Sequence, residues 1–215
     1  MKALSELVIA PANMQSTRMD DVFEIIDGRS RPYTINKDHS LRNATFVDTS
    51  YKIPGGGLIS TAEDLARFSI ALESNTLLNA EITKLMWASQ TTTDGQPTGY
   101  GYGWDVKQQN GILWVEHTGR QPGSSSILLL LPSRGFAVSI MSNTDNMNIT
   151  PIAKTTGQCV LEHWGCEAIN NELFSKAWSD SFRMMSSVAA CPGAVLQAIC
   201  QPIPNRRAAP KEASP

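Results

Sequence analysis

The sequence lacks any apolar run long enough to cross a bilayer. Its longest run, Ile127–Pro132, has the length of a strand, whereas a membrane-spanning helix needs about 20 apolar residues. Neither sign of charge prevails either, since 18 Lys and Arg stand against 20 Asp and Glu, which gives a net charge of -2. This balance leaves no broad electrostatic footprint for nucleic acid or an anionic membrane. We therefore expect no membrane span and no nucleic-acid partner.

A secretory signal peptide is also lacking, because the apolar stretch near the N-terminus is short and is broken by Glu6. The compartment therefore remains unassigned. Without an export signal we favour thiols over disulfides for the four cysteines, all towards the C-terminal end of the chain: Cys159, Cys166, Cys191 and Cys200. Two of them flank His163, which suggests a metal site, but the spacing is irregular and a helix is the preferred interpretation. We expect no metal and no cofactor.

Length and composition fit one domain with a tail. The chain has 215 residues, of which 41% are hydrophobic and 18% are charged, enough for one buried core and too apolar for wholesale disorder. We predict a domain over residues 1–165, a helical extension of uncertain relation over 166–201 and a disordered tail over 202–215. The tail has four prolines and no apolar periodicity.

The first half of the chain predicts loops followed by helices. Residues 1–50 carry several turn signals around one short predicted helix near Asp20–Ile26. A glycine run at 55–57 precedes Ser60 and Glu63, whose spacing is that of a capping box at a helix start. Apolar residues then recur at helical spacing from Leu65. A second helix is predicted over Glu81–Ser89.

After Thr91 the pattern changes towards the two-residue period of strands. We predict an antiparallel meander of four strands, joined by turns at 109–111 and 132–135: Gly99–Val106, Ile112–His117, Ser125–Leu131 and Phe136–Met141. The apolar run Ile127–Leu131 predicts a strand buried on both faces, which requires helices packed against the sheet. Helices are predicted over Pro151–Trp164 and Glu172–Met185. The expected class is α+β, an antiparallel sheet flanked by helices.

The sharpest local feature is His117-Thr118-Gly119, at the end of a predicted strand. These residue types are typical of one side of an acyl-transfer active site, because the histidine and the hydroxyl can contact the substrate and the glycine lets it approach the backbone. Alone, the three residues would be read as an ordinary strand end. Their weight comes from four other segments that occur with them in a fixed order: Pro11–Thr17, Tyr51–Leu65, Gly99–Trp104 and Leu129–Pro132.

In this order and approximate spacing, the five segments resemble the serine β-lactamase-related family over about residues 7–160. This family contains class C β-lactamases, D-alanyl-D-alanine carboxypeptidases, family VIII esterases and LACTB-like serine hydrolases. The resemblance implies an antiparallel sheet flanked by helices, a helical subdomain, and a cleft between them faced by Ser-x-x-Lys, Tyr-x-Asn and Lys-Thr-Gly or His-Thr-Gly. It makes His117 the catalytic candidate and Thr118 and Gly119 substrate-binding candidates, while the backbone N–H of Arg120 lines the oxyanion hole.

The chain departs from this pattern in one important respect. No serine stands three residues before any lysine, and no asparagine stands two residues after any tyrosine. The expectation is therefore the C-terminal part of a serine hydrolase acting on an ester, amide or β-lactam through an acyl-enzyme, inactive or nearly so alone. The alternative is a non-catalytic domain that binds a peptide, a peptidoglycan fragment or a partner chain, with self-association through an exposed sheet edge.

Other residues offer weaker candidates. Lys154-Thr155-Thr156-Gly157 superficially resembles Lys-Thr-Gly but falls in a predicted helix. Ser124, Ser125 and Ser126 have no base at an activating spacing and are interpreted as turn and strand residues. Two histidines, His39 and His163, are assigned to the surface or core, and three aromatics are strand residues that could also line the cleft rim: Tyr100, Tyr102 and Trp104.

Overall fold

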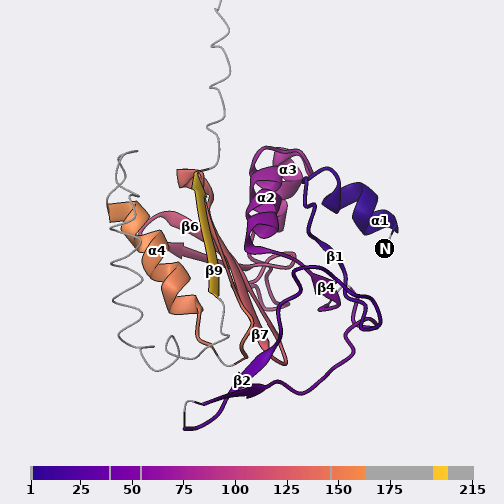
Figure 1. The fold of residues 1–215 in the computed structure, drawn as a ribbon. Helices are drawn as coiled ribbons and strands as arrows, with labels where there is room; N and C mark the ends of the chain where they lie inside the picture. Colours follow the sequence, from indigo (N-terminus) through magenta and orange to yellow (C-terminus); the bar gives the residue numbers. More distant parts are fainter. Residues whose placement is uncertain (1, 39, 54, 146, 163–195, 203–215) are drawn as a thin grey trace, which may run out of the picture.

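A computed structural model describes residues 2–38, 40–53, 55–145, 147–162 and 196–202. Its centre is an antiparallel sheet in the order β5-β6-β7-β8-β9. Helix α4 lies on one face and α2 on the other, with α3 beside α2 and α1 farther out (Figure 1). The predicted α+β class, with its helix-flanked antiparallel sheet, is confirmed.

Four strands of the sheet follow one another as hairpins, which confirms the predicted meander: β5 (Asp105–Gln109), β6 (Ile112–Gln121), β7 (Ser124–Leu131) and β8 (Phe136–Ser142). The predicted end of the second strand at His117 is wrong, because pairing with β7 carries β6 on to Gln121. The turn between β5 and β6 places Asn110 at φ 51° and Gly111 at φ 74°. Positive φ at both central residues is what a two-residue hairpin with the natural strand twist requires. Strand β7 pairs with β6 and β8 along its whole length.

The run of five apolar residues in β7 faces two separate cores. Ile127, Leu129 and Leu131 belong to the core on the α4 face. Leu128 and Leu130 belong to the core on the α2 face, together with Leu72 of that helix. The prediction that this strand is buried on both faces is confirmed, because helices cover it on either side.

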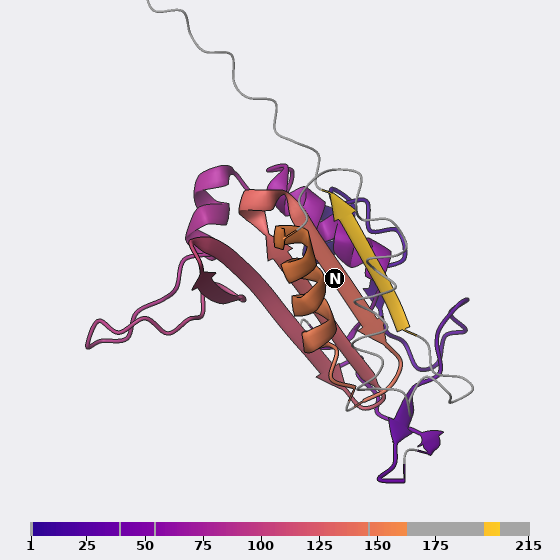
Figure 2. The ribbon, with the colours of Figure 1, turned by 90° about the vertical axis from the view of Figure 1, so that its left-hand side faces the viewer.

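Helix α4 (Thr150–Glu162) lies across the sheet (Figure 2). It agrees with the predicted helix as far as the described residues reach. Gly157 permits a close approach, since a Cβ there would stand 3.0 Å from the indole of Trp114. Lys154 also lies in this helix, and its Nζ is 3.0 Å from Oε1 of Glu116 on β6.

The helix starts differ from the sequence prediction by one residue. Helix α2 (Ala62–Glu73) is capped by Thr61, whose hydroxyl accepts the backbone N–H of Asp64. The predicted Ser60 cap is therefore wrong, because the extended residue before the helix is Thr61. Helix α3 (Ala80–Met86) is capped by Asn79 in the same way and is shorter than predicted.

The N-terminal prediction needs correction. Helical backbone occurs at α1 (Lys2–Leu4) and the π-helical turn Ser5–Ile9 that follows it, and not at Asp20–Ile26, which is a series of bends. Phe23 and Ile25 are 93% and 98% exposed, so no packing stabilises a helix there. Two short ribbons flank this region, β1 (Arg18–Met19) with β4 (Leu58–Ile59), and β2 (Tyr33–Ile35) with β3 (Leu41–Asn43).

A second correction concerns the strand predicted over Gly99–Val106. Gly99 and Gly103 have φ of 71° and 81°, and the chain turns until β5 begins at Asp105. Alternating glycines and aromatics therefore mark a folded loop here, because the glycines supply left-handed backbone that a strand does not use.

The C-terminal predictions fall largely outside the described residues. These include the helix over Glu172–Met185, His163, and the tail beyond Pro202. One segment of the predicted helical extension is described and is not helical: Leu196–Pro202 forms β9, which pairs antiparallel with β8. No helix in the described part of the chain is both long and apolar enough to span a membrane.

Candidate active site

The His-Thr-Gly residues lie on β6 at the point where the strand loses one of its neighbours. Strand β5 pairs with β6 from Gln109–Ile112 up to Asp105–Glu116. Beyond Glu116, β6 continues to Gln121, and within the described part of the chain its only partner there is β7. His117, Thr118, Gly119 and Arg120 are thus brought together on a strand segment with one free edge.

Hairpin geometry determines which backbone groups point to that edge. Gln121 and Ser124 flank the two-residue turn between β6 and β7 and form its first hydrogen-bonded pair, so the odd-numbered residues of β6 bond to β7. The turn between β5 and β6 gives the same parity, since Ile112 bonds to Gln109. The N–H and C=O groups of Thr118 and Arg120 therefore face the free edge, and neither N–H donates to an acceptor among the described residues.

The side chains alternate between the two faces of the sheet. His117 and Gln121 share the α2 face with Val115, while Thr118 and Arg120 share the α4 face with Glu116. Glu116 is 8% exposed and forms its ion pair with Lys154 there. Gly119 leaves room for the side chain of Ser126 on β7, because a Cβ at position 119 would stand 2.5 Å from the Ser126 Oγ.

Tyr100 contacts His117 from the loop before β5. Its hydroxyl is 3.1 Å from Nε2 of the histidine, and the two rings meet edge to face with centroids 6.2 Å apart. Both side chains are exposed. The sequence placed Tyr100 in a strand or at the cleft rim and gave no sign of this contact, which depends on the folded loop.

The turn at the end of β6 is held by the β2–β3 ribbon. Gly123 has φ of 73°, and a Cβ there would stand 2.3 Å from Cβ of Pro32 and 2.7 Å from Cβ of Ala44. The Gly123 N–H donates to Oδ2 of Asp145 at 3.3 Å, and the Thr34 hydroxyl donates to the same oxygen at 2.8 Å. The free segment of β6 is therefore anchored at its far end as well.

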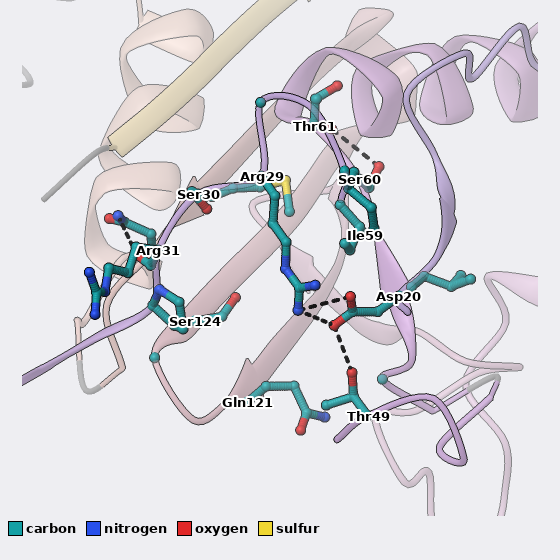
Figure 3. Close-up of a pocket in the computed structure, with 18 of the residues that line it drawn as sticks. Asp20, Arg29, Ser30, Arg31, Thr49, Ile59, Ser60, Thr61, Gln121 and Ser124 are labelled. Carbon is teal, nitrogen blue, oxygen red and sulfur yellow. Dashed lines mark hydrogen bonds and ion pairs between the residues drawn. The ribbon is translucent and has the colours of Figure 1, made fainter. Parts of the chain in front are cut away.

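A cavity of about 940 Å³ opens at this turn. Gln121 and Ser124 line it from the sheet, whereas His117 to Arg120 do not. Figure 3 shows Arg29 and Asp20 paired inside it, with the Thr49 hydroxyl donating to Asp20 at 3.1 Å. Lys52 approaches Gln121, with Nζ 3.2 Å from Oε1. The sequence did not single out Asp20, Arg29, Lys52 or Gln121.

A buried carboxylate joins two of the segments that the sequence singled out. Asp64 is 1% exposed and accepts hydrogen bonds from the backbone N–H of Ser16 and the hydroxyl of Thr17, both at 2.8 Å. The Thr17 and Ser60 hydroxyls are also 2.8 Å apart. Pro11–Thr17 is thereby fixed to the start of α2, next to the cavity.

Two aspartates, half-buried Asp48 and exposed Asp94, have a pKa below the usual range. The pKa of Asp48, near the cavity, is lowered because the side chain and backbone of Ser50 hydrogen-bond to its carboxylate. The pKa of Asp94 is lowered chiefly by the hydroxyl of Thr92. Both shifts arise from local turns.

The remaining candidates have structural settings where the structure describes them. Ser125 is buried and donates to the carbonyl of Thr144 at 3.0 Å. Lys154 sits in α4 and pairs with Glu116. No group of three or more metal-ligating side chains occurs in the described ranges. His39, His163, Cys166 and Cys191 lie outside those ranges, and of Cys200 only the backbone is described.

Solved structures share this fold. The octameric penicillin-binding protein homologue from Pyrococcus abyssi superimposes with a TM-score of 0.63 at 20% identity, covering 75% of this chain and 37% of that one. The D-amino acid amidase from Ochrobactrum anthropi gives 0.56 at 18% identity, covering 84% and 50%. The architecture is thus that of the penicillin-binding protein and β-lactamase fold.

The family follows from the sequence comparison. Residues 2–155 match the family model described as Beta-lactamase, and the chain belongs to this family of serine hydrolases. Human "serine beta-lactamase-like protein LACTB, mitochondrial" is 30% identical over 180 residues, which cover 66% of this chain and 33% of that protein. The chain therefore spans about a third of the length of this relative.

Proposed function

We propose that His117–Arg120 form the carbonyl-binding wall of a serine hydrolase that acts on an ester, amide or β-lactam through an acyl-enzyme. His117 is the catalytic side chain, Thr118 and Gly119 bind substrate, and the backbone N–H of Arg120 donates to the oxyanion. The 215 residues contain no Ser-x-x-Lys or Tyr-x-Asn. The nucleophile and its activating groups must therefore come from residues other than these.

One observation carries the proposal: the N–H of Arg120 faces a free strand edge beside His117. An oxyanion donor must be fixed before the reaction and must have no protein acceptor of its own. The Arg120 N–H is fixed because β6 is paired with β7 on one side and the turn at Gly123 is held at its end. It has no strand acceptor because β5 ends before it reaches Arg120.

The residue at position 117 favours esters and peptides over β-lactams. A neutral imidazole is a weaker anchor for the β-lactam carboxylate than a lysine ammonium. The likeness to a D-amino acid amidase agrees with amide or ester chemistry, although it shows the fold alone. Once a segment that carries Ser-x-x-Lys and Tyr-x-Asn has been added, steady-state rates much higher with cephalosporins than with short-chain esters would contradict this preference.

The absence of a nucleophile can be tested on the chain by itself. We expect a fluorophosphonate probe to leave the purified 215-residue protein unlabelled, because its sequence contains no Ser-x-x-Lys to supply an activated serine. Labelling is read by gel fluorescence and intact mass. Specific labelling that disappears when one serine is replaced by alanine would place the nucleophile in this chain.

The role of the Arg120 N–H requires a preparation that hydrolyses substrate, made by adding a segment that carries Ser-x-x-Lys and Tyr-x-Asn. Arg120→Pro removes the N–H without breaking the β6–β7 ladder, because that N–H faces the free edge. Loss of one oxyanion donor lowers kcat about 100- to 1000-fold. Arg120→Ala is the matched control, since it removes the side chain and keeps the N–H. Equal rates for the two variants would refute the assignment.

The same free edge favours one alternative function. An exposed strand segment whose N–H and C=O groups lack partners can accept an extended peptide or a partner chain as an added strand. If no hydrolysis appears with the added segment, but a D-alanyl-D-alanine peptide shifts the Thr118 and Arg120 amide resonances, the chain is a binding domain. Recovered hydrolysis supports the enzyme.

A further inference from the structure

The two ring nitrogens of His117 have different surroundings. Nε2 lies 3.1 Å from the Tyr100 hydroxyl, and the edge-to-face contact of the rings fixes the imidazole plane. No hydrogen bond to Nδ1 occurs among the described residues. Any group that binds the histidine in the site can therefore use Nδ1 without displacing Tyr100.

The backbone that carries Tyr100 is firmly held. The Gln90 N–H donates to the Tyr100 carbonyl at 2.8 Å, and the Tyr102 N–H donates to the Met86 carbonyl at 3.0 Å. Gly101 lets the loop press against the end of α3, since a Cβ there would stand 2.3 Å from the Met86 oxygen. Tyr100 is thus placed in advance, before any substrate binds.

We infer that the Tyr100 hydroxyl donates to Nε2 and holds neutral His117 in the tautomer that carries its proton on Nδ1. A phenol is a much stronger acid than a neutral imidazole N–H, so the hydroxyl is the donor. The hydrogen bond at one ring nitrogen decides which nitrogen bears the proton. Tyr100 is therefore a positioning residue that acts through His117.

This inference rests on the proposed function and names the role of His117 within it. With Nδ1–H making no hydrogen bond within the described residues, the histidine can donate one to a substrate oxygen. Through Nδ1–H, His117 donates a hydrogen bond to a carbonyl or carboxylate oxygen of the substrate. Because Nδ1 already carries a proton, it does not act as a proton acceptor. Its partners in the oxyanion-binding edge are the N–H groups of Thr118 and Arg120.

The test is the ¹⁵N resonances of the imidazole rings in the 215-residue chain, recorded at a pH where the rings are neutral. His117→Gln identifies which signals belong to His117. We expect a protonated-type Nδ1 and an unprotonated-type Nε2 in the parent protein. Tyr100→Phe should shift the tautomer ratio about 2- to 12-fold towards Nε2–H, the effect of losing one net hydrogen bond.

Tyr102→Phe is the matched control, because Tyr102 lies on the same loop and forms neither a hydrogen bond nor a ring contact with His117. It should leave the ratio unchanged, and a dispersed amide spectrum shows that each variant is folded. A parent protein with its proton on Nε2, or an unchanged ratio in Tyr100→Phe, would overturn the inference. Neither result depends on turnover, so the acyl-transfer proposal stands or falls separately by the Arg120→Pro comparison.

Discussion

The two halves of β6 differ in almost every respect, although they form one continuous strand. Ile112–Glu116 is paired with β5 throughout and with β7 at Val115 and Glu116, and it includes Trp114, Val115 and Glu116, which are 5%, 0% and 8% exposed. In His117–Gln121 only β7 is a partner, and three of the five side chains are exposed. The first half is held rigidly by its packing and pairing. The second half continues the same strand, so its backbone N–H and C=O groups at the free edge are fixed in position but unpaired, as a binding site requires.

Hydrogen exchange should show the largest difference between the halves. The amides of Trp114 and Glu116 bond to β5, whereas those of Thr118 and Arg120 face the free edge. We expect the second pair to exchange at least about 100-fold faster. His117 and Gly119 are the internal control, since their amides bond to β7 and should be protected. Slow exchange at Thr118 and Arg120 would show that the edge is covered.

Truncation of one side chain in each half of β6 should lower the unfolding free energy by very different amounts. Trp114→Ala removes a buried indole that contacts α4 at Gly157, and we expect it to cost about 3–5 kcal/mol of unfolding free energy. Arg120→Ala should stay within about 0.5 kcal/mol, because the side chain is exposed and forms no ion pair or hydrogen bond within the described residues. Urea unfolding with an unchanged slope measures both. Similar costs would remove the distinction between the halves.

The far end of the free half can be loosened by one methyl group. Gly123→Ala forces a left-handed backbone on a residue with a Cβ and presses it against Pro32, so we expect a loss of about 2 kcal/mol. Gly119→Ala in the same strand is the matched comparison, with an expected loss below about 1 kcal/mol. Its new Cβ meets only the movable hydroxyl of Ser126. The reverse order would show that the turn is not an anchor.

Local patterns predicted the strand that carries the site but not the contacts around it. The period-two alternation and the turn residues place the hairpins of β6, β7 and β8 correctly, and α4 follows from its apolar spacing. Tyr100 was not predicted as a partner of His117, because glycines at positive φ turned an apparent strand into a loop. Asp20–Ile26 failed as a helix since propensity alone does not stabilise a segment that buries nothing. Strand β9 pairs with a distant segment, which no local pattern encodes.

The smallest expected effect concerns the junction between the two halves. Glu116 is the last residue of β6 paired with β5. Its side chain is 11% exposed, and its Oε1 lies 3.0 Å from the Lys154 Nζ on α4. A double-mutant cycle of Glu116→Gln and Lys154→Met should give a coupling energy of about 1 kcal/mol, because Lys154 is 39% exposed and partly screened by water.

The same cycle on Lys2 and Glu6 supplies the control for this measurement. Those side chains are 87% and 61% exposed at 3.9 Å, so no measurable coupling is expected. Coupling at Glu116 that matched this control would mean that α4 does not fix the strand where β5 ends. The rigidity of the free half would then have to come from β7 and the Gly123 anchor alone, because the ion pair would add nothing to it.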